Sequence, residues 1–235
     1  MPGARPLRQF WPRQAVTITL AFDCAVTGLS AAVLRDDACL ARAASPGRDQ
    51  PARLLPTISH VLDQAKVGRQ DIELIAVTVG PGSFTGVRVG LATARGLALA
   101  LGVPLAGIAT TAVLLAQDPA DVAAIDSRLG DWFCALRDDG QPFLADAPAL
   151  AARLSGRSAS LVGAGAEALA ESLRALGIDA VARDQLPDAA ALARLALARG
   201  VAHWRQSNER EGMPRPLYLR GVNVTLPDGQ RRTVE

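Results

Sequence analysis

The chain has 235 residues, of which 49% are apolar and only 4% are aromatic, and its formal net charge is +2. The apolar content suffices for a globular core of one or two domains, whereas the balanced charge and the scarcity of aromatic residues argue against strong autonomous binding of RNA or DNA. Three cysteines without C-x-x-C spacing and only two histidines argue against disulfides and against a metal site, and favour a reducing cytoplasm.

The N-terminal half begins with fifteen residues that we expect to be disordered. They contain arginines but no apolar segment typical of a secretion signal, so the sequence does not predict secretion. Apolar or alternating segments at 16–22, 29–34 and 38–43 are separated by polar turns, which predicts a three-stranded antiparallel meander. A helix at 52–66, a strand at 72–79, a helix at 84–101 and a strand at 104–109 follow. This βββαβαβ order is typical of one lobe of an actin-like or ribonuclease-H-like α/β fold with a mixed sheet.

A second, smaller and more irregular region follows this lobe. Its predicted elements are a hairpin at 122–126 and 132–137, a strand at 161–162, a helix at 167–176 and a helix from 188 to about 205. We therefore divide the chain into a first lobe at 16–113, a second lobe at 114–222 and a C-terminal tail at 223–235. The last helix or the tail could pack back on the first lobe.

The loop Gly80–Gly86, with the sequence GPGSFTG, joins the strand at 72–79 to the apolar helix behind it. Free amides at a helix start attract anions, and Ser83 or Thr85 could cap this helix. The loop lacks the lysine of a Walker motif, and its glycines do not have the G-x-G-x-x-G spacing of a dinucleotide-binding loop. Neither nucleotide motif is satisfied.

The helix after this loop carries small residues every fourth position, starting with Gly82, Gly86 and Gly90. Glycine within a helix costs roughly 0.5–1 kcal/mol relative to alanine, so this stripe predicts close packing of another helix. We expect that helix to come from another subunit, so that Gly86→Leu should leave the monomer folded but abolish association. An ordinary core helix of one domain is the alternative. The amphipathic helix at 52–66 would complete the surface, whose candidate residues are Leu54, Leu55, Ile58, Leu62, Gly82, Gly86, Val87, Gly90, Leu91 and Arg95.

Candidate catalytic groups are few. Asp23 and Thr27, after the first strand, could orient a hydrated Mg²⁺ or a phosphate, but Asp23 is better explained as a cap of the turn. A hydrolase based on Ser83 would need His60 or His203 as its base, and a two-metal nuclease would need more carboxylates on strands. We expect no catalytic residue and no metal ligand, and regard Asp23, Thr27 and Ser83 as candidates for a vestigial nucleotide or phosphate contact.

A distinctive run joins Ala76-Val77-Thr78-Val79, GPGSFTG at 80–86 and the segment from Val87 to Ala98. By this run, and by weaker matches at 54–56, 124–128 and 216–220, the chain resembles the bacterial TsaB proteins, also called YeaZ, over roughly residues 16–222. The chain departs from the family's pattern at Pro51-Ala52-Arg53 and at Asp23-Cys24-Ala25, which weakens the case for nucleotide contact at the latter turn.

The resemblance implies a two-lobed, actin-like protein that acts in formation of threonylcarbamoyladenosine on tRNA, at the adenosine next to the anticodon. It implies a scaffold without catalysis of its own that dimerises with and activates the catalytic subunit TsaD, with the ATPase TsaE in the complex and tRNA contacted only indirectly. It implies no cofactor of the chain's own, allows ATP or ADP at the subunit interface, and involves neither membrane nor DNA. Alone, we expect a homodimer. A stand-alone ATPase or a glycoprotease-like hydrolase is the alternative.

Overall fold

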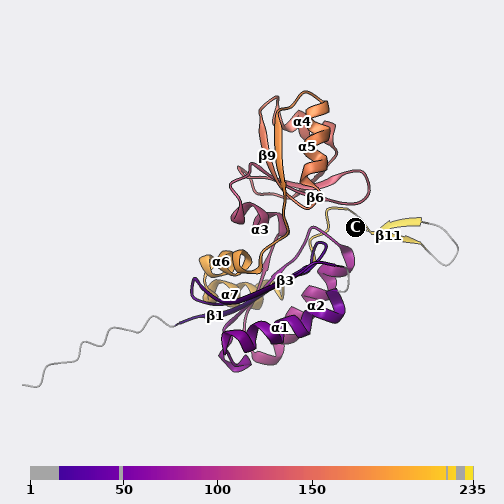
Figure 1. The fold of residues 1–235 in the computed structure, drawn as a ribbon. Coiled ribbons are helices and arrows are strands. Elements are labelled where there is room, and N and C mark those ends of the chain that lie inside the picture. The colour runs from indigo at the N-terminus through magenta and orange to yellow at the C-terminus, as the bar shows by residue number, and fades with distance from the viewer. Residues whose placement is uncertain (1–15, 48–49, 221, 226–230, 235) are drawn as a thin grey trace, which may run out of the picture.

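The computed structural model describes residues 16–47, 50–220, 222–225 and 231–234, so the segment 1–15 predicted to be disordered lies outside the described residues. Two five-stranded sheets, each accompanied by helices, form two lobes that are stacked one above the other (Figure 1). This is the predicted two-lobed α/β fold.

The first sheet has the strand order β3-β2-β1-β4-β5. Its strands are β1 (Ile18–Asp23), β2 (Leu29–Arg35), β3 (Ala38–Ser45), β4 (Leu74–Thr78) and β5 (Leu105–Ile108). The first three are antiparallel, and β4 and β5 run parallel to β1. The meander and the βββαβαβ order predicted from the sequence are therefore confirmed.

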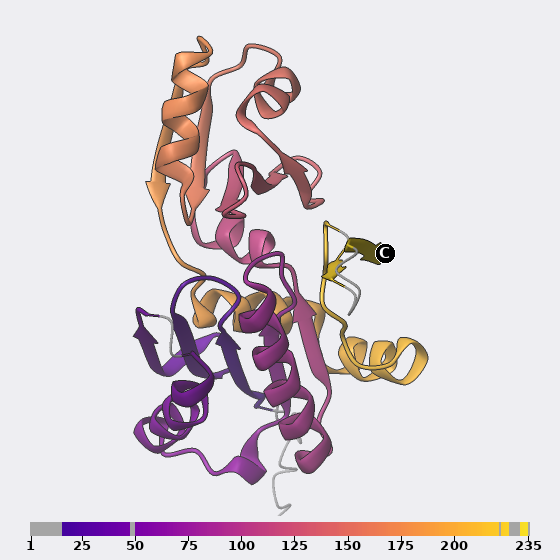
Figure 2. The same cartoon turned by 90° about the vertical axis from the view of Figure 1, so that its right-hand side faces the viewer.

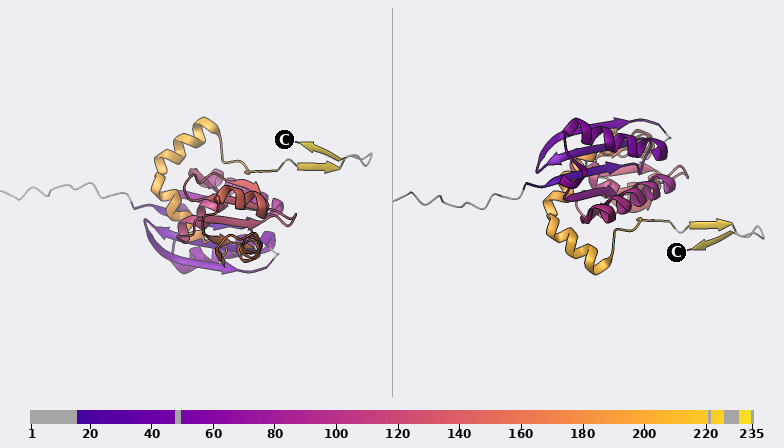
Figure 3. Two further views of the ribbon diagram at one scale, coloured as in Figure 1. Left: turned by 90° about the horizontal axis from the view of Figure 1, so that it is seen from above. Right: turned by 90° about the horizontal axis from the view of Figure 1, so that it is seen from below.

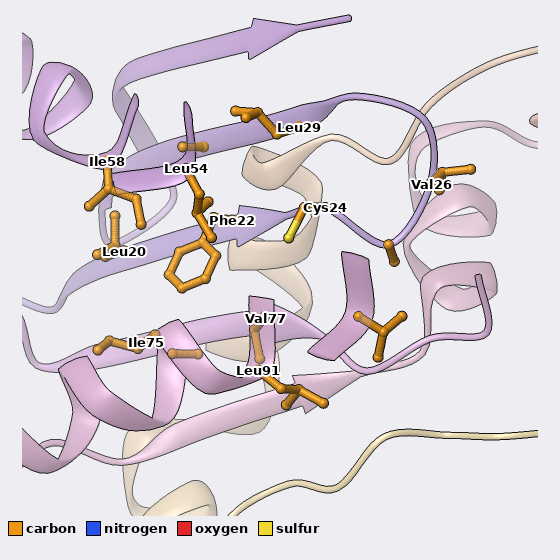
Figure 4. Close-up of a cluster of buried hydrophobic side chains, with 14 of the residues drawn as sticks. Leu20, Phe22, Cys24, Val26, Leu29, Leu54, Ile58, Ile75, Val77 and Leu91 are labelled. Carbon is orange, nitrogen blue, oxygen red and sulfur yellow. The ribbon is translucent and has the colours of Figure 1, made fainter. Parts of the chain in front are cut away.

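Helices cover both faces of this sheet. On one face lie α1 (Gln50–Ala65) and α2 (Phe84–Leu101), with the short 3-10 helix η1 (Arg69–Asp71) after α1; on the other lies α6 (Ala189–Arg199), followed by α7 (Val201–Glu211). Side chains alternate along a strand, so in β1 Leu20 and Phe22 join the core beneath α1 and α2, while Ala21 faces α6. Figure 4 shows Leu20, Phe22, Leu54 and Ile58 together in the first of these cores.

The second sheet has the strand order β10-β9-β6-β7-β8. Its strands are β6 (Val122–Asp126), β7 (Trp132–Leu136), β8 (Phe143–Ala145), β9 (Ala159–Gly163) and β10 (Ala180–Asp184), and its helices are α3 (Thr110–Gln117), α4 (Ala147–Leu154) and α5 (Ala166–Ala175). The predicted hairpin is the antiparallel pair β6 and β7, and the predicted strand at 161–162 is the centre of β9. The elements α3, β8, α4 and β10 were not predicted.

The end of the second lobe differs from the prediction. Its sheet ends at Asp184, so the expected boundary at residue 222 is too late. The helices α6 and α7 both return to the first lobe, which confirms the expectation that the last helix could pack back on it. The predicted single helix from 188 to 205 is two helices, because Gly200 adopts φ 82° and ψ 150° and turns the chain between them. Beyond them, β11 (Val222–Thr225) and β12 (Arg231–Val234) form a hairpin that stands away from both lobes (Figure 3).

Helix α2 is long and apolar enough, by length and composition alone, to cross a membrane, a property that core helices of globular proteins share. Its residues Val87, Leu91 and Ala94 are buried against the first sheet, and Arg88 and Arg95 interrupt its apolar sequence. One side of α2 is therefore part of the core of the first lobe.

Candidate interaction surface and interlobe cleft

The glycine-rich loop ties the start of α2 to the turn that follows β1. The Ser83 hydroxyl accepts a hydrogen bond from the Gly86 amide at 3.2 Å, and the Ser83 amide donates to the Ala25 carbonyl at 2.6 Å. Gly80 has φ 98°, a conformation that favours glycine. The prediction that Ser83 caps the helix is confirmed.

The glycine stripe of α2 faces this same turn and not a foreign helix. A Cβ atom at Gly82 would lie 2.0 Å from the Ala25 carbonyl oxygen, and one at Gly86 would lie 2.0 Å from the Cys24 carbonyl oxygen. At Gly90 a Cβ atom would lie 2.9 Å from the Cys24 sulfur. The glycines permit close approach, as their spacing predicted, but the close element belongs to the chain itself. The prediction that a partner's helix packs on this stripe was wrong.

Most of the apolar candidate residues are also used internally. The buried members, which join the core between the helices and the first sheet, are Leu54, Ile58, Leu62, Val87 and Leu91. Leu91 and Leu54 are labelled within this core in Figure 4. Placing them at an interface was wrong because a partner could reach them only by opening the first lobe. Arg95 is half-buried, and its guanidinium donates to the Pro214 carbonyl. Only Leu55 among the ten candidates has a largely exposed side chain, at 55%.

The face of the helix pair that solvent reaches is made of other residues. On α2 they include Ala92, Gly96 and Leu99, of which Leu99 is 77% exposed and Gly96 has no atom within 4 Å of its would-be Cβ. On α1, Leu55 is likewise exposed, and we call the exposed positions Leu55, Ala92, Gly96 and Leu99 the outer face. The sequence contained the signal for it, since positions 92, 96 and 99 lie on the side of the helix opposite to its buried residues.

A cavity of about 860 Å³ lies between the lobes. Its walls come from the glycine-rich loop, the turns after β1 and β6, and the segment that follows α7, and they include Thr27, Ser83, Asp126, Arg128 and Tyr218. A separate pocket of about 450 Å³ is lined by Asp23 and again by Thr27. The structure therefore places Thr27 beside both cavities, but it does not bring Asp23 and Ser83 into one site.

Asp23 is buried at the end of β1, with 3% of its surface exposed. One carboxylate oxygen accepts hydrogen bonds from the Thr78 hydroxyl at 2.5 Å and from the Ala25 amide at 3.1 Å. Burial raises the pKa of Asp23 to about 6, although both hydrogen bonds oppose this shift. The bond to Ala25 makes Asp23 a cap of the turn, the explanation favoured from the sequence.

Cys24, beside it, is equally confined. Its sulfur lies 3.2 Å from the Gly86 carbonyl oxygen, and burial raises the pKa of the thiol to about 12 with help from the nearby Asp23 carboxylate. Within residues 16–47, 50–220, 222–225 and 231–234, no three His, Cys, Asp or Glu side chains are grouped closely enough to hold a metal ion.

The sequence of this chain is similar to those of known proteins. The family profile of TsaD, tRNA N6-adenosine threonylcarbamoyltransferase, matches residues 47–128, which span α1, α2 and the first strand of the second lobe. The chain is 35% identical to the TsaB protein of Escherichia coli over 123 residues, which are 49% of this chain and 53% of that protein. It is 33% identical to the TsaB protein of Bacillus subtilis over 99 residues, 42% of this chain and 43% of that protein.

Among solved structures, YeaZ from Pseudomonas aeruginosa superposes with a TM-score of 0.62 and 26% identity, covering 86% of this chain and all of that one. A Pseudomonas aeruginosa protein described as similar to the peptidase YeaZ superposes with a TM-score of 0.67 and 27% identity over 87% of this chain. The matched segments define a two-lobed protein with the actin-like α/β fold. The sequence matches span about half the length of the curated relatives. In sequence and in structure the chain is therefore similar to the TsaB/YeaZ proteins, as its motifs predicted.

Proposed function

We propose that this chain acts in the formation of threonylcarbamoyladenosine on tRNA, as a scaffold subunit without catalysis of its own. In this proposal it dimerises with the catalytic subunit TsaD and activates it, with TsaE joining the cytoplasmic complex and tRNA bound within the assembly. The names of the TsaB relatives and the match to the TsaD profile support this pathway. The scaffold role and the partners are our inference.

The observation that carries the proposal is the outer face of α1 and α2. Leu55 on α1 and Leu99 on α2 expose 55% and 77% of their surface. On α2, the position of a Cβ atom at Gly96 faces open space. A large exposed leucine on each of two packed helices marks a surface that gains free energy when covered. Since Gly96 has no side chain, a partner's helix can approach α2 closely there. Alone, this face would pair with a second copy of the chain.

The experiment is co-purification with TsaD from cells that produce both proteins, with tRNA modification as a second measurement. We expect Leu55→Glu and Leu99→Glu to leave the chain folded, because both side chains are exposed, and to abolish co-purification and modification. Leu176→Glu is the matched control, since Leu176 is 50% exposed at the end of α5 in the other lobe. Unchanged co-purification of both α1–α2 variants would exclude this surface.

The geometry of the candidate catalytic residues supports a role without chemistry. Ser83 caps α2 and Asp23 caps the turn after β1, and the two do not line a common cavity. The chain assayed alone should therefore neither hydrolyse ATP nor cleave peptides, and any ATP or ADP would bind at the interface with the partner. Turnover by the isolated chain that is lost on Asp23→Ala or Ser83→Ala would favour the ATPase or glycoprotease-like alternative instead.

A further inference from the structure

The segment Met213–Arg220, which we call the strap, follows α7 and runs along the first lobe. It is held at the edge strand β5, where a Cβ atom at Gly107 would lie 2.4 Å from the side chain of Pro214. Further along, the Leu217 amide donates to the Val79 carbonyl at 2.8 Å. Just before the strap, the Asn208 side chain bonds both the amide and the carbonyl of Leu105 in β5, at 2.7 and 3.0 Å. The strap is therefore fixed to the first lobe along its length.

Two arginines of α2 bind the strap. Arg95 donates to the Pro214 carbonyl from its Nε at 3.1 Å, and Arg88 donates from its Nε to the Tyr218 hydroxyl at 2.8 Å. The Tyr218 ring stacks on Phe84, with centroids 5.7 Å apart, and the Arg88 guanidinium lies 3.8 Å from the Phe84 centroid. Figure 2 shows the strap on one side of α2 and α1 on the other, so the strap forms one flank of the outer face.

The last residue of the strap reaches the second lobe. Arg220 forms an ion pair with Asp131, in the turn between β6 and β7, and the two side chains are only 33% and 19% exposed. Asp131 also accepts a hydrogen bond from the Ser127 hydroxyl, and its carbonyl accepts one from the Ser127 amide at 3.1 Å. The Leu129 amide in turn donates to the Ser127 hydroxyl at 3.2 Å. The ion pair therefore joins the strap to the whole turn.

This contact spans the interlobe cleft. Leu217 and Arg220 line one wall of the cavity, and Ser127 and Leu129 line the wall opposite. The chain itself crosses between the lobes at residue 109, between β5 and α3, and at 185–188, and Figure 2 shows the second crossing on the far side of the junction from the strap. The strap is thus a separate connection across the open side of the cleft.

We propose that the strap is a latch that ties α2 to the second lobe, so that a change at the surface of α2 alters how firmly the two lobes are held together. Arg88 is the exposed end of this connection. From Arg88 the connection runs through Tyr218 and Arg220 of the strap to Asp131. A partner that binds Arg88 or Phe84 competes for the contact with Tyr218 and loosens the latch; by reciprocity, a loosened latch changes the affinity of that surface. Only this last regulatory use rests on the proposed function.

The test is amide hydrogen exchange, resolved by residue with NMR, on the free full-length chain without any partner. In Arg220→Gln and in Arg88→Ala we expect the Ser127 and Leu129 amides to exchange about tenfold faster, since the turn opens locally once its latch is released. Tyr218→Phe, which keeps the ring but removes the hydroxyl that Arg88 binds, should give the same result as Arg88→Ala. The control is Arg194→Ala, which breaks the exposed ion pair between Arg194 and Asp37 within the first lobe.

The outcomes separate the possibilities. Faster exchange in Arg88→Ala, Tyr218→Phe and Arg220→Gln but not in the control establishes the latch. Acceleration in Arg220→Gln alone overturns it, because α2 would then have no influence on the second lobe, and equal acceleration in the control overturns it as general loosening. Because no partner is present, loss of the proposed interaction with TsaD would leave this result unaffected.

Discussion

Replacing Gly86 by alanine tests whether the glycine stripe serves the chain's own core. The added Cβ would lie 2.0 Å from the Cys24 carbonyl oxygen and 3.2 Å from the carbonyl carbon. A normal contact would be more than 3 Å, and the opposing atom belongs to the backbone, so no side-chain rotation relieves the clash. The turn after β1 or the start of α2 must move instead.

The magnitude follows from two opposing effects. Overpacking of a tight core costs roughly 1–3 kcal/mol, and a backbone clash belongs at the upper end of that range. Alanine recovers up to about 1 kcal/mol of helix propensity. We therefore expect Gly86→Ala to lower the free energy of unfolding by about 2 kcal/mol, equivalent to a Tm lower by roughly 4–8 °C for a chain of this size. Gly96→Ala, in the same helix but in open space, should raise it by about 0.5–1 kcal/mol.

Urea unfolding followed by circular dichroism measures both variants against the parent chain. The reasoning would be refuted if Gly86→Ala were as stable as the parent chain, because the stripe would then be free to receive another helix as the sequence suggested. A loss of stability in Gly96→Ala would equally contradict the assignment of its position to the open outer face.

Three further predictions concern titration, thiol reactivity and the cap of α2. The folded-state pKa of Asp23 is raised from 3.8 to about 6. The stability that the protonated carboxyl contributes is therefore complete below the ordinary pKa of an aspartate and is lost as the pH rises through 6. This loss amounts to about 3 kcal/mol of unfolding free energy at neutral pH, and Asp23→Asn should not show it. If urea unfolding gave parallel stability profiles for the two proteins from pH 4 to 8, this prediction would be wrong. Cys39 is exposed, whereas Cys24 and Cys134 are buried and their thiol pKa values are raised to about 12. A thiol reagent should therefore label Cys39 quickly in the native chain and the other two slowly. Rapid labelling of all three would show that the cores open. Ser83→Ala removes a helix cap and should cost about 1 kcal/mol, whereas Ser83→Asp should retain most of that stability, and equal losses in the two variants would show that capping is not its role.

The first lobe could be predicted from the sequence because each of its elements has a strong local pattern. Apolar or alternating segments separated by short polar turns define β1 to β3, and Gly102 in a left-handed conformation ends α2 where the sequence indicated. The elements missed in the second lobe are short or unusually exposed. β8 has three residues, and β10 exposes Val181, Arg183 and Asp184, so neither carries a strong periodic signal.

The candidate surface failed for a different reason. Periodicity showed that Gly86 and Gly90 needed a close neighbour, but not which one, because the neighbour is Cys24, more than sixty residues earlier in the chain. The same limit applies to the strap. Nothing near Arg220 in the sequence indicates Asp131 as its partner, since contacts between segments far apart in the sequence depend on the completed fold.

The return of α6 to the first sheet makes this lobe discontinuous along the chain. Alanines at 189, 190, 193 and 196 lie against Ala21, Ala32, Ala76 and Ala106, a layer in which both surfaces have short side chains. During synthesis, when the chain has emerged from the ribosome only as far as Asp184, helix α6 does not yet cover this face of the first sheet. The N-terminal lobe can therefore finish folding only after the segment beyond the second lobe has emerged, and the second lobe, whose strands are contiguous in sequence, can be complete before it.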